Sequence, residues 1–259
     1  MKLGIIGWFD EVSFQLAANQ NLEFMELCVN DAAEAFLTML EQTKLYSEQY
    51  DLPIASLGRW GADKIDASGC IIESELALEY QLIEAAAYLE CPIYVTGCNF
   101  IETLSYFENV KAAITYFEKL IEYGKLYNVK IATYNCRWNN FVHSDMAWEL
   151  IHGYLKDLGI KYDTSHCIYA GGDYLSETKK WGHRFVHVHI KGALVVDNTR
   201  YDDPPAGLDQ TDWRSFMALL YSVGYDAGLS IEPHSAIWRG ELGDRGTAYT
   251  IRYMRELII

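Results

Sequence analysis

The sequence predicts a (β/α)₈ barrel, which is a closed parallel sheet surrounded by helices. Short apolar segments alternate with segments of helical periodicity, the pattern of parallel strands joined by crossover helices. Eight such apolar segments occur in a chain of 259 residues, and a barrel of this kind takes about 250 residues. We therefore expect a single barrel domain that spans residues 1–259.

The eight predicted strands are short apolar runs, and several helical segments between them are clear. In the segments 110–124, 147–158 and 213–223, apolar residues recur three and four positions apart, as on one face of an amphipathic helix. An open doubly wound sheet is the alternative fold, but it usually carries a glycine-rich phosphate loop after its first strand, which is missing here. The predicted strands are Leu3–Trp8, Leu22–Val29, Pro53–Leu57, Pro92–Thr96, Val129–Tyr134, Ile160–Asp163, Phe185–Ile190 and Gly228–Glu232.

Composition narrows the class of protein. A formal net charge of −15 argues against nucleic acid as a partner, because affinity for nucleic acid comes largely from Lys and Arg contacts with phosphates. No apolar run approaches the roughly 20 residues of a membrane-spanning helix, and the N-terminus lacks the pattern of a signal peptide. We therefore expect a cytoplasmic protein without a membrane partner. Its six cysteines form no C-x-x-C pair and are expected to be reduced thiols.

Three consecutive predicted strands carry polar residues where they end. In a (β/α)₈ barrel the active site lies at the C-terminal ends of the strands. Asp163 ends the sixth strand, His187 and His189 share a face of the seventh, and Glu232 ends the eighth. Asp163, His189 and Glu232 thus lie at about the same height, and mixed carboxylate and imidazole ligands suit a divalent ion. His187 lies two residues deeper, so we expect it not to be a ligand.

Each of these residues also has an ordinary structural explanation. Asp163 could cap a loop or helix, His189 could be a hydrogen-bonded core residue, and Glu232 could pair with a lysine. Their shared height at the strand ends favours convergence on one site over three unrelated roles.

Several motifs in the second half of the chain occur together in one known family. They are Asp163-x-x-His166, the strand segment 187–191, the segments 204–207 and 212–213, and the segments 224–226 and 230–234. At these residues the sequence resembles the xylose isomerase-like barrel superfamily, specifically its sugar phosphate isomerase/epimerase branch. The resemblance covers nearly the whole chain and is weaker in the first half.

The resemblance implies a divalent metal ion, such as Mn, Zn, Co or Mg, held by residues at the ends of strands five to eight. Three ligands carry over as Asp163, His189 and Glu232, and His166 corresponds to a residue that usually contacts substrate. The fourth ligand, a glutamate on strand five, is replaced by Tyr134. A second departure is at position 192, where the family usually has Asp and this chain has Gly.

The predicted catalytic residues are Glu232, Tyr134 and Lys191. Glu232 is the candidate base that removes a proton beside a carbonyl, with the metal as Lewis acid. We expect the Tyr134 hydroxyl to point toward Asp163, His189 and Glu232, acting as an acid or only orienting substrate. Lys191 is expected to bind an anionic group or stabilise the enediolate; the alternative is a solvated or ion-paired lysine.

Further residues in the loops after the strands are candidates for contact with substrate, and each has rim packing or surface exposure as its alternative. We also expect residues 192–211 to form a long lid over the pocket without regular secondary structure. The predicted substrate-binding residues are His166, His234, Arg137, Trp8 and Trp60.

The leading functional hypothesis is an isomerase or epimerase that acts on a small sugar or sugar derivative through an enediolate. A dehydratase or other lyase of a keto-polyol is the second, because it needs only one base and tolerates Tyr134 better. A sugar-binding barrel that has lost catalysis is the third, and an endonuclease-type phosphodiesterase ranks last. The expected partner is a small-molecule sugar. The oligomeric state stays open, with a homo-oligomer as one alternative.

Overall fold

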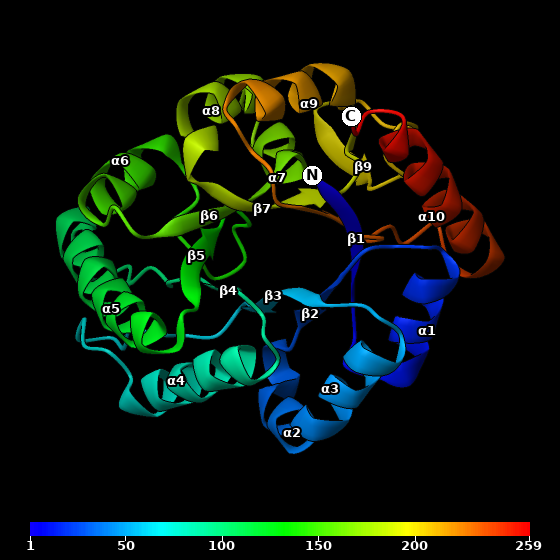
Figure 1. Ribbon diagram of the computed structural model, residues 1–259. Coiled ribbons are helices and arrows are strands. Elements are labelled where there is room, and N and C mark those ends of the chain that lie inside the picture. Colours follow the sequence, from blue (N-terminus) through cyan, green and yellow to red (C-terminus); the bar gives the residue numbers. More distant parts are fainter.

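The computed structural model describes residues 1–259, and its eight parallel strands close into a barrel (Figure 1). Each strand pairs with the next along the chain, and the last pairs with the first. The predicted fold and all eight predicted strands are confirmed, with their ends shifted by a few residues. The barrel strands are β1 (Lys2–Gly7), β2 (Met25–Cys28), β3 (Ile54–Arg59), β4 (Ile93–Thr96), β5 (Lys130–Tyr134), β6 (Gly159–Asp163), β7 (Phe185–Ile190) and β10 (Gly228–Ile231).

Helices surround the barrel on all sides in Figure 1. The longest is also the most clearly bounded by the sequence: it begins with a capping box between Ser105 and Glu108 and ends at Asn128, whose φ of 56° is left-handed. The helices are α1 (Glu11–Asn19), α2 (Ala33–Thr38), α3 (Leu40–Gln49), α4 (Glu73–Tyr88), α5 (Tyr106–Tyr127), α6 (Asp145–Tyr154), α7 (Thr164–Tyr169), α8 (Tyr174–Trp181), α9 (Trp213–Ser222) and α10 (Gly240–Arg255), with short 3₁₀ turns at Asn30–Ala32 and Gly182–Arg184.

The apolar core lies mainly between the strands and the helices. Tyr162 of β6 stacks on Phe185 of β7, with ring centroids 4.4 Å apart, and Phe216 of α9 covers them from outside. The inside of the barrel contains a second, smaller apolar cluster and several fully buried polar side chains. The polar side chains lie toward β2, β6, β7 and β10, so the sheet positions charged groups where most barrels place apolar ones.

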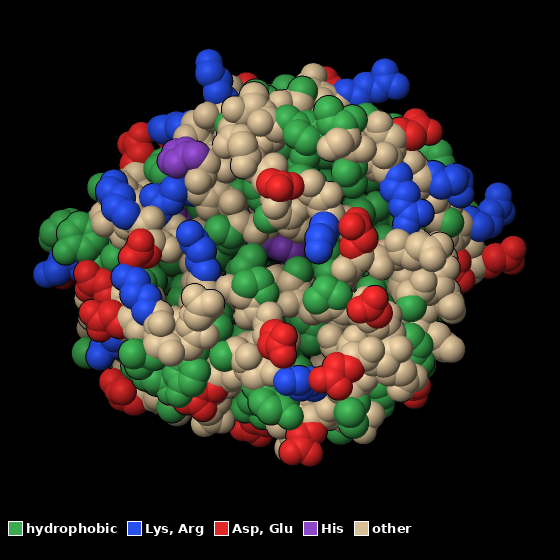
Figure 2. All heavy atoms as spheres, viewed as in Figure 1, with side chains coloured by type: hydrophobic (Ala, Val, Ile, Leu, Met, Phe, Trp, Pro, Cys, Tyr) green, Lys and Arg blue, Asp and Glu red, His purple; other side chains and the backbone are tan.

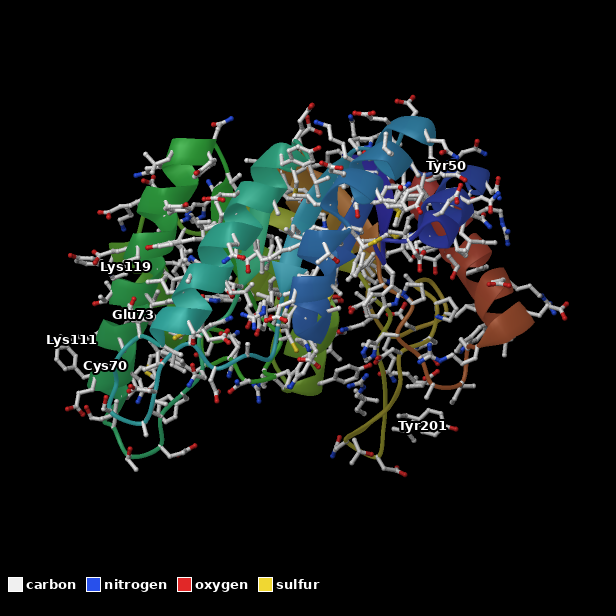
Figure 3. The ribbon with its side chains drawn as sticks, turned by 90° about the horizontal axis from the view of Figure 1, so that it is seen from below. Tyr50, Cys70, Glu73, Lys111, Lys119 and Tyr201 are labelled. Atoms are coloured by element: carbon white, nitrogen blue, oxygen red, sulfur yellow. The ribbon has the colours of Figure 1, made fainter.

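The segment after β7 contains a hairpin, which corrects the expectation that residues 192–211 lack regular structure. Its strands, β8 (Leu194–Val196) and β9 (Thr199–Asp202), pair antiparallel. Asp197 and Asn198 form the turn with φ of 50° and 58°, which is the positive-φ pair that a tight hairpin requires. In Figure 3 the hairpin, marked by Tyr201, projects from the end of the barrel opposite Tyr50, beyond the C-terminal ends of the strands.

Helix lengths and surface charges are the features on which binding to a membrane or to a charged partner would depend. None of the helices has both the length and the apolar character needed to cross a membrane. On the face drawn in Figure 2, Lys and Arg side chains are interspersed with Asp and Glu around the rim.

Candidate active site

The structure brings Asp163, His189 and Glu232 together at the C-terminal end of the barrel. Each offers one possible ligand atom, and these atoms lie within 4.8 Å of one another. Strand register explains the convergence, because Asp163 is level with His189 on the neighbouring strand and His189 is level with Ser230, two residues before Glu232. His187 is not in this group. The sequence therefore predicts the convergence correctly.

Asp163 is held from both sides and is fully buried. Its backbone N–H donates to the Asn135 side chain at 2.9 Å, and the Asn135 amide donates to the Asp163 carbonyl at 2.8 Å. One carboxylate oxygen accepts the Ser165 N–H at 2.9 Å, so Asp163 also caps helix α7. The other oxygen, Oδ2, is left to face the centre of the site.

Lys191 places a buried ammonium among the predicted metal ligands. Its Nζ lies 2.8 Å from Asp163 Oδ2, 3.0 Å from Glu232 Oε2 and 3.2 Å from His166 Nε2. Burial disfavours the charge, but the neighbouring carboxylates of Asp163 and Glu232 outweigh it and raise the pKa of Lys191. Burial lowers the pKa of His166 to about 4, so its ring is neutral and accepts a hydrogen bond from the lysine.

His189 is engaged through both ring nitrogens. Nδ1 lies 3.1 Å from Glu232 Oε2, and Nε2 lies 2.7 Å from Oε2 of Glu26 on β2. His187 lies two residues deeper in β7, and its Nε2 lies 2.8 Å from the same Glu26 oxygen. Burial opposes a charge on His189, but Glu26 raises its pKa above the ordinary value. For His187 burial dominates, and its pKa is lowered.

By donor type the site offers ligands for a divalent ion, in two groups that share His189. As the side chains lie, however, the donor atoms of the Asp163, His189 and Glu232 group already have partners, whereas Glu26 Oε1 and His187 Nδ1 of the second group have none. The Lys191 ammonium contacts the carboxylate oxygens of Asp163 and Glu232 that an ion would use, and both nitrogens of His189 face other carboxylates. Strand β5 adds no carboxylate. In this arrangement the Asp163, His189 and Glu232 group therefore does not fit the ion that the sequence motifs imply, because the Lys191 ammonium occupies its centre.

Tyr134 does not face this group, which corrects the expected direction of its hydroxyl. The hydroxyl donates to the Trp138 carbonyl at 3.2 Å and accepts the Gly61 N–H at 3.4 Å, on the β3–β5 side of the barrel. It fills the space beside Gly97, where a Cβ would come within 2.5 Å of it. Burial raises the pKa of Tyr134, so the phenol stays protonated at neutral pH. Tyr134 is therefore placed as a packed and hydrogen-bonded residue.

Trp60 is buried inside the barrel mouth and does not line an open rim. Its ring lies 5.8 Å from the ring of Tyr134 and 4.9 Å from Nζ of Lys161, which is also buried. An aromatic face stabilises a cation at this distance. The apolar cluster around Trp60 is thus in contact with the buried ammonium of Lys161.

His166 and Arg137 line one cavity, as expected of residues that contact a shared ligand. The cavity has a volume of about 150 Å³ and is also lined by Asn135 and His143. His166 therefore connects the ammonium of Lys191 with a space large enough for a small molecule.

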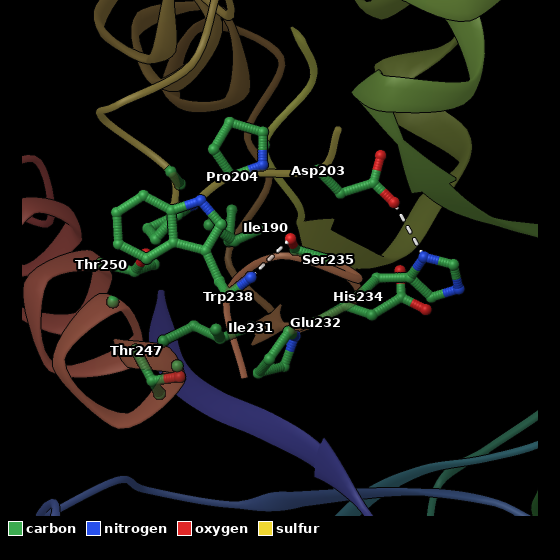
Figure 4. A pocket seen from close by; sticks show the side chains of 16 residues that line it. Ile190, Asp203, Pro204, Ile231, Glu232, His234, Ser235, Trp238, Thr247 and Thr250 are labelled. Atoms are coloured by element: carbon green, nitrogen blue, oxygen red, sulfur yellow. Dashed lines mark hydrogen bonds and ion pairs between the residues drawn. The ribbon is translucent and has the colours of Figure 1, made fainter. Parts of the chain in front are cut away.

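Glu232 and His234 border a second pocket, together with Trp238 (Figure 4). It has a volume of about 30 Å³, roughly the space of one water molecule. His234 Nδ1 lies 2.8 Å from Asp203 Oδ2 at the base of the hairpin. His234 is therefore tied to the hairpin and does not reach the centre of the site.

Trp8 lies apart from the other candidates. It is 58% exposed after β1, and its ring packs edge-on against Phe9. The structure brings it into contact with none of the other predicted site residues.

Sequence reasoning missed the roles of Asn135, Lys161 and Asp203, and it did not identify the histidine partners of Glu26. Strand alternation predicts that Glu26 points inward, but its two histidine partners lie more than 160 positions away in the chain. Asn135 follows Tyr134 directly in the strand-five segment, and this position was a signal that it could belong to the site.

The glycine at position 192, where the family usually has aspartate, has a steric explanation. A Cβ on Gly192 would lie 2.0 Å from the Pro204 carbonyl oxygen, so aspartate is excluded there.

The fold and this group of residues define a (β/α)₈ barrel with a carboxylate, imidazole and ammonium site at its C-terminal end. The chain belongs to the xylose isomerase-like TIM barrel family, whose model matches residues 14–257. No curated protein matches the sequence.

Solved structures of sugar epimerases and related enzymes share the whole fold. D-allulose 3-epimerase from Methylomonas sp. is 16% identical, with a TM-score of 0.79 over 99% of this chain and 98% of that one. The 3-keto-D-glucoside 4-epimerase from E. coli is 16% identical, with a TM-score of 0.76 over 99% of both chains. A probable 3-DHS dehydratase from Bacillus anthracis is 14% identical, with a TM-score of 0.76 over 98% of this chain and 99% of that one.

Proposed function

We propose that this protein is an isomerase or epimerase of a small sugar or sugar derivative that moves a proton on the carbon beside a carbonyl. The observation that carries the proposal is the position of Glu232. Its carboxylate belongs to the buried charged group, which consists of Asp163, His189, Lys191 and Glu232 itself. The Glu232 side chain is nevertheless 19% exposed, so it is the group's acidic member with access to solvent and to a ligand.

Glu232 is ionised throughout the physiological pH range. Burial would raise its pKa, but Lys191 and His189 outweigh burial and hold the pKa well below the ordinary value. An ionised carboxylate accepts the proton of an activated C–H bond, and the electron pair of that bond moves toward the carbonyl oxygen. Returning a proton to the neighbouring carbon gives an isomer, and returning it to the opposite face of the original carbon gives an epimer.

The cavity beside His166 and Arg137 can take the part of the substrate that is remote from Glu232, which lines the other pocket. A polyol supplies hydroxyl groups that neutral imidazole and amide groups such as Asn135 can bind, and Arg137 supplies charge for an anionic substituent. The sugar epimerases among the structures of the same fold support a sugar as the substrate class. The proposed partner is accordingly a small sugar.

A dehydratase is the second candidate function, and one observation favours it. Because the Tyr134 hydroxyl is bound to Trp138 and Gly61, strand β5 supplies no acid or base on the second face of the substrate. Elimination needs one base and one acid, which Glu232 and Lys191 supply, whereas a symmetric two-base epimerisation needs a second group.

Product analysis separates the two candidates. The purified protein would be incubated in D₂O with ketohexoses, 3-keto-glycosides and keto-polyols, and followed by NMR. Deuterium at the carbon beside the carbonyl, with an epimer or isomer accumulating, supports the proposal. Loss of water from the substrate supports the dehydratase, and binding without exchange on every substrate contradicts both.

A Glu232→Gln variant tests the base directly. Its amide keeps the shape but accepts no proton, so the exchange rate should fall by about 10²–10⁴-fold. The matched control is Glu34→Gln, an exposed residue of the outer helix α2. Equal exchange rates in Glu232→Gln and the wild type would remove Glu232 from the mechanism.

A further inference from the structure

We propose that the ammonium of Lys191 takes the place of the divalent cation at the mouth of this barrel, so that the enzyme polarises its substrate without a metal ion. The inference rests on the proposed function for the reaction and on geometry for the cation. Lys191 Nζ lies 2.8 Å from Asp163 Oδ2 and 3.0 Å from Glu232 Oε2, between two of the three candidate ligands.

Steric and electrostatic reasons exclude an ion and the ammonium from sharing this position. A divalent transition ion binds carboxylate oxygen at about 2.0–2.2 Å. The two oxygens in question already contact the ammonium, so an ion bound to both would lie against a positive charge in a buried site. Repulsion between charges at that separation is strong where water is excluded. Lys191 would have to leave before an ion could bind.

Both ring nitrogens of His189, the third candidate ligand, also have partners already. Its Nε2 lies 2.7 Å from Glu26 and its Nδ1 lies 3.1 Å from Glu232. An imidazole binds a metal through a nitrogen that carries no proton and faces the ion. Here each nitrogen faces a carboxylate oxygen, which is the arrangement of a ring that donates hydrogen bonds. Glu26 therefore orients His189 as a donor.

The loss of the strand-five carboxylate agrees with this arrangement. Tyr134 occupies that place, and its hydroxyl is directed away to Trp138 and Gly61. The site has three carboxylates, those of Glu26, Asp163 and Glu232, and the ammonium groups of Lys191 and Lys161 lie within the same buried interior. The protein thus supplies its own positive charge, from Lys191, in a site that lacks the strand-five carboxylate.

Lys191 can exchange one of its present hydrogen-bond acceptors for a substrate oxygen. Its three N–H groups face Asp163, Glu232 and His166, and the 3.2 Å contact with His166 is the longest of the three. A substrate carbonyl oxygen entering from the cavity beside His166 would replace that imidazole as acceptor. When the C–H bond breaks, its proton goes to Glu232 and its electron pair ends on the carbonyl oxygen, next to the ammonium. The step needs no oxidant or reductant.

Metal content and metal binding test the proposal without any assay of activity. The wild-type protein, purified without chelators, should contain no stoichiometric transition metal by elemental analysis. Titration with Mn²⁺ in a calorimeter should give no saturable binding at millimolar concentration. Lys191→Met removes the charge but keeps the length, and Asp163, His189 and Glu232 should then bind Mn²⁺ on the order of tenfold more tightly or better.

The matched control is Lys180→Met. Lys180 of α8 also lies between two carboxylates, those of Asp145 and Glu149, but on the surface. Its loss should leave Mn²⁺ binding unchanged. A stoichiometric ion in the wild type, or wild-type Mn²⁺ affinity equal to that of Lys191→Met, overturns the proposal. The wild-type measurements decide the question even if Lys191→Met does not fold.

Exchange assays separate this inference from the proposed function. If a substrate is found, turnover should survive exhaustive treatment with EDTA and be lost in Lys191→Met. Turnover that disappears with EDTA and returns with Mn²⁺ contradicts the metal-free mechanism while supporting the proposed reaction. If no substrate exchanges, the proposed function fails, and the metal-binding comparison still tests the role of the ammonium.

Discussion

The carboxylate of Glu26 lies 2.7 Å from Nε2 of His189, although the two residues are 163 positions apart in the sequence. Both are fully buried, and the same carboxylate oxygen also contacts His187. The contact spans the barrel interior from β2 to β7 and sets the orientation of the His189 ring. It therefore links the first part of the chain to a site otherwise built from its second half.

Replacing Glu26 with Gln should lower the pKa of His189. Glu26 opposes the effect of burial on this ring, and a neutral amide leaves burial as the dominant influence. A ¹⁵N NMR titration of the histidine ring nitrogens measures the shift. The exposed Glu34→Gln variant serves as control, and an unchanged His189 titration in Glu26→Gln would show that the carboxylate is electrostatically unimportant.

Replacing Tyr134 with Phe should affect stability more than turnover. The variant loses the hydrogen bond to the Trp138 carbonyl, which contributes about 1 kcal/mol to the free energy of unfolding. The hydroxyl contacts no member of the charged group, so the rate of proton exchange should change by less than a few fold. Urea denaturation and the D₂O exchange assay measure the two effects. A large loss of turnover at unchanged stability would return Tyr134 to the catalytic residues.

Acidification should destabilise the protein partly through His152. This residue of α6 is fully buried, and burial lowers its pKa from 6.5 to about 3. The folded chain keeps the ring neutral while the unfolded chain binds a proton below pH 6.5. The stability is therefore complete above pH 6.5 and declines as the pH falls toward 3, by about 2 kcal/mol at pH 5.

Urea denaturation at pH 7 and pH 5 measures this dependence. A His152→Asn variant should be less stable at pH 7 but lose less stability on acidification than the wild type. The exposed His183 offers a control, since His183→Asn should keep the wild-type dependence. Parallel pH profiles for the wild type and His152→Asn would contradict the assignment.

Replacing Asp203 with Ala should loosen the β8–β9 hairpin. The Asp203 carboxylate accepts a hydrogen bond from Tyr169 and pairs with Arg200 and His234, so it ties the hairpin to α7 and to the loop after β10. Amide hydrogen exchange in residues 194–202 should accelerate by about tenfold or more, which corresponds to about 1.4 kcal/mol of local stability. Asp244→Ala, on the exposed face of α10, should leave this exchange unchanged. Protection of the hairpin that survives in Asp203→Ala would place its support elsewhere.

The sequence predicts the strands well because each strand is a local property. Phe185–Ile190, for example, is bounded by polar residues and has the same limits in the prediction and the structure. Asp163, His189 and Glu232 follow from the same logic, since alternation and strand ends decide their face and height. The hairpin was also predictable, because Asp197-Asn198 between two short apolar or β-branched runs is a tight-turn signal.

Contacts across the barrel could not be predicted in this way. Lys191 lies one residue beyond β7, and nothing in its neighbours along the chain indicates whether a long side chain turns to solvent or back toward Asp163. The direction of the Tyr134 hydroxyl likewise depends on space beside Gly97, which belongs to another strand. Such choices depend on the packing of distant segments, which periodicity does not encode.

The pairing of β1 with β10 has a consequence for synthesis of the chain. Lys2 is level with Gly228, and the amino group of Met1 lies 2.7 Å from the Asp226 carboxylate. On the ribosome, β1 emerges early, and the edge that pairs with β10 remains unpaired until residue 231 has left the exit tunnel. A nascent chain that stalls after β7 exposes two unpaired strand edges, which are templates for association with other chains. Newly made copies that are truncated before β10 should therefore depend on chaperones to a degree that the completed barrel does not.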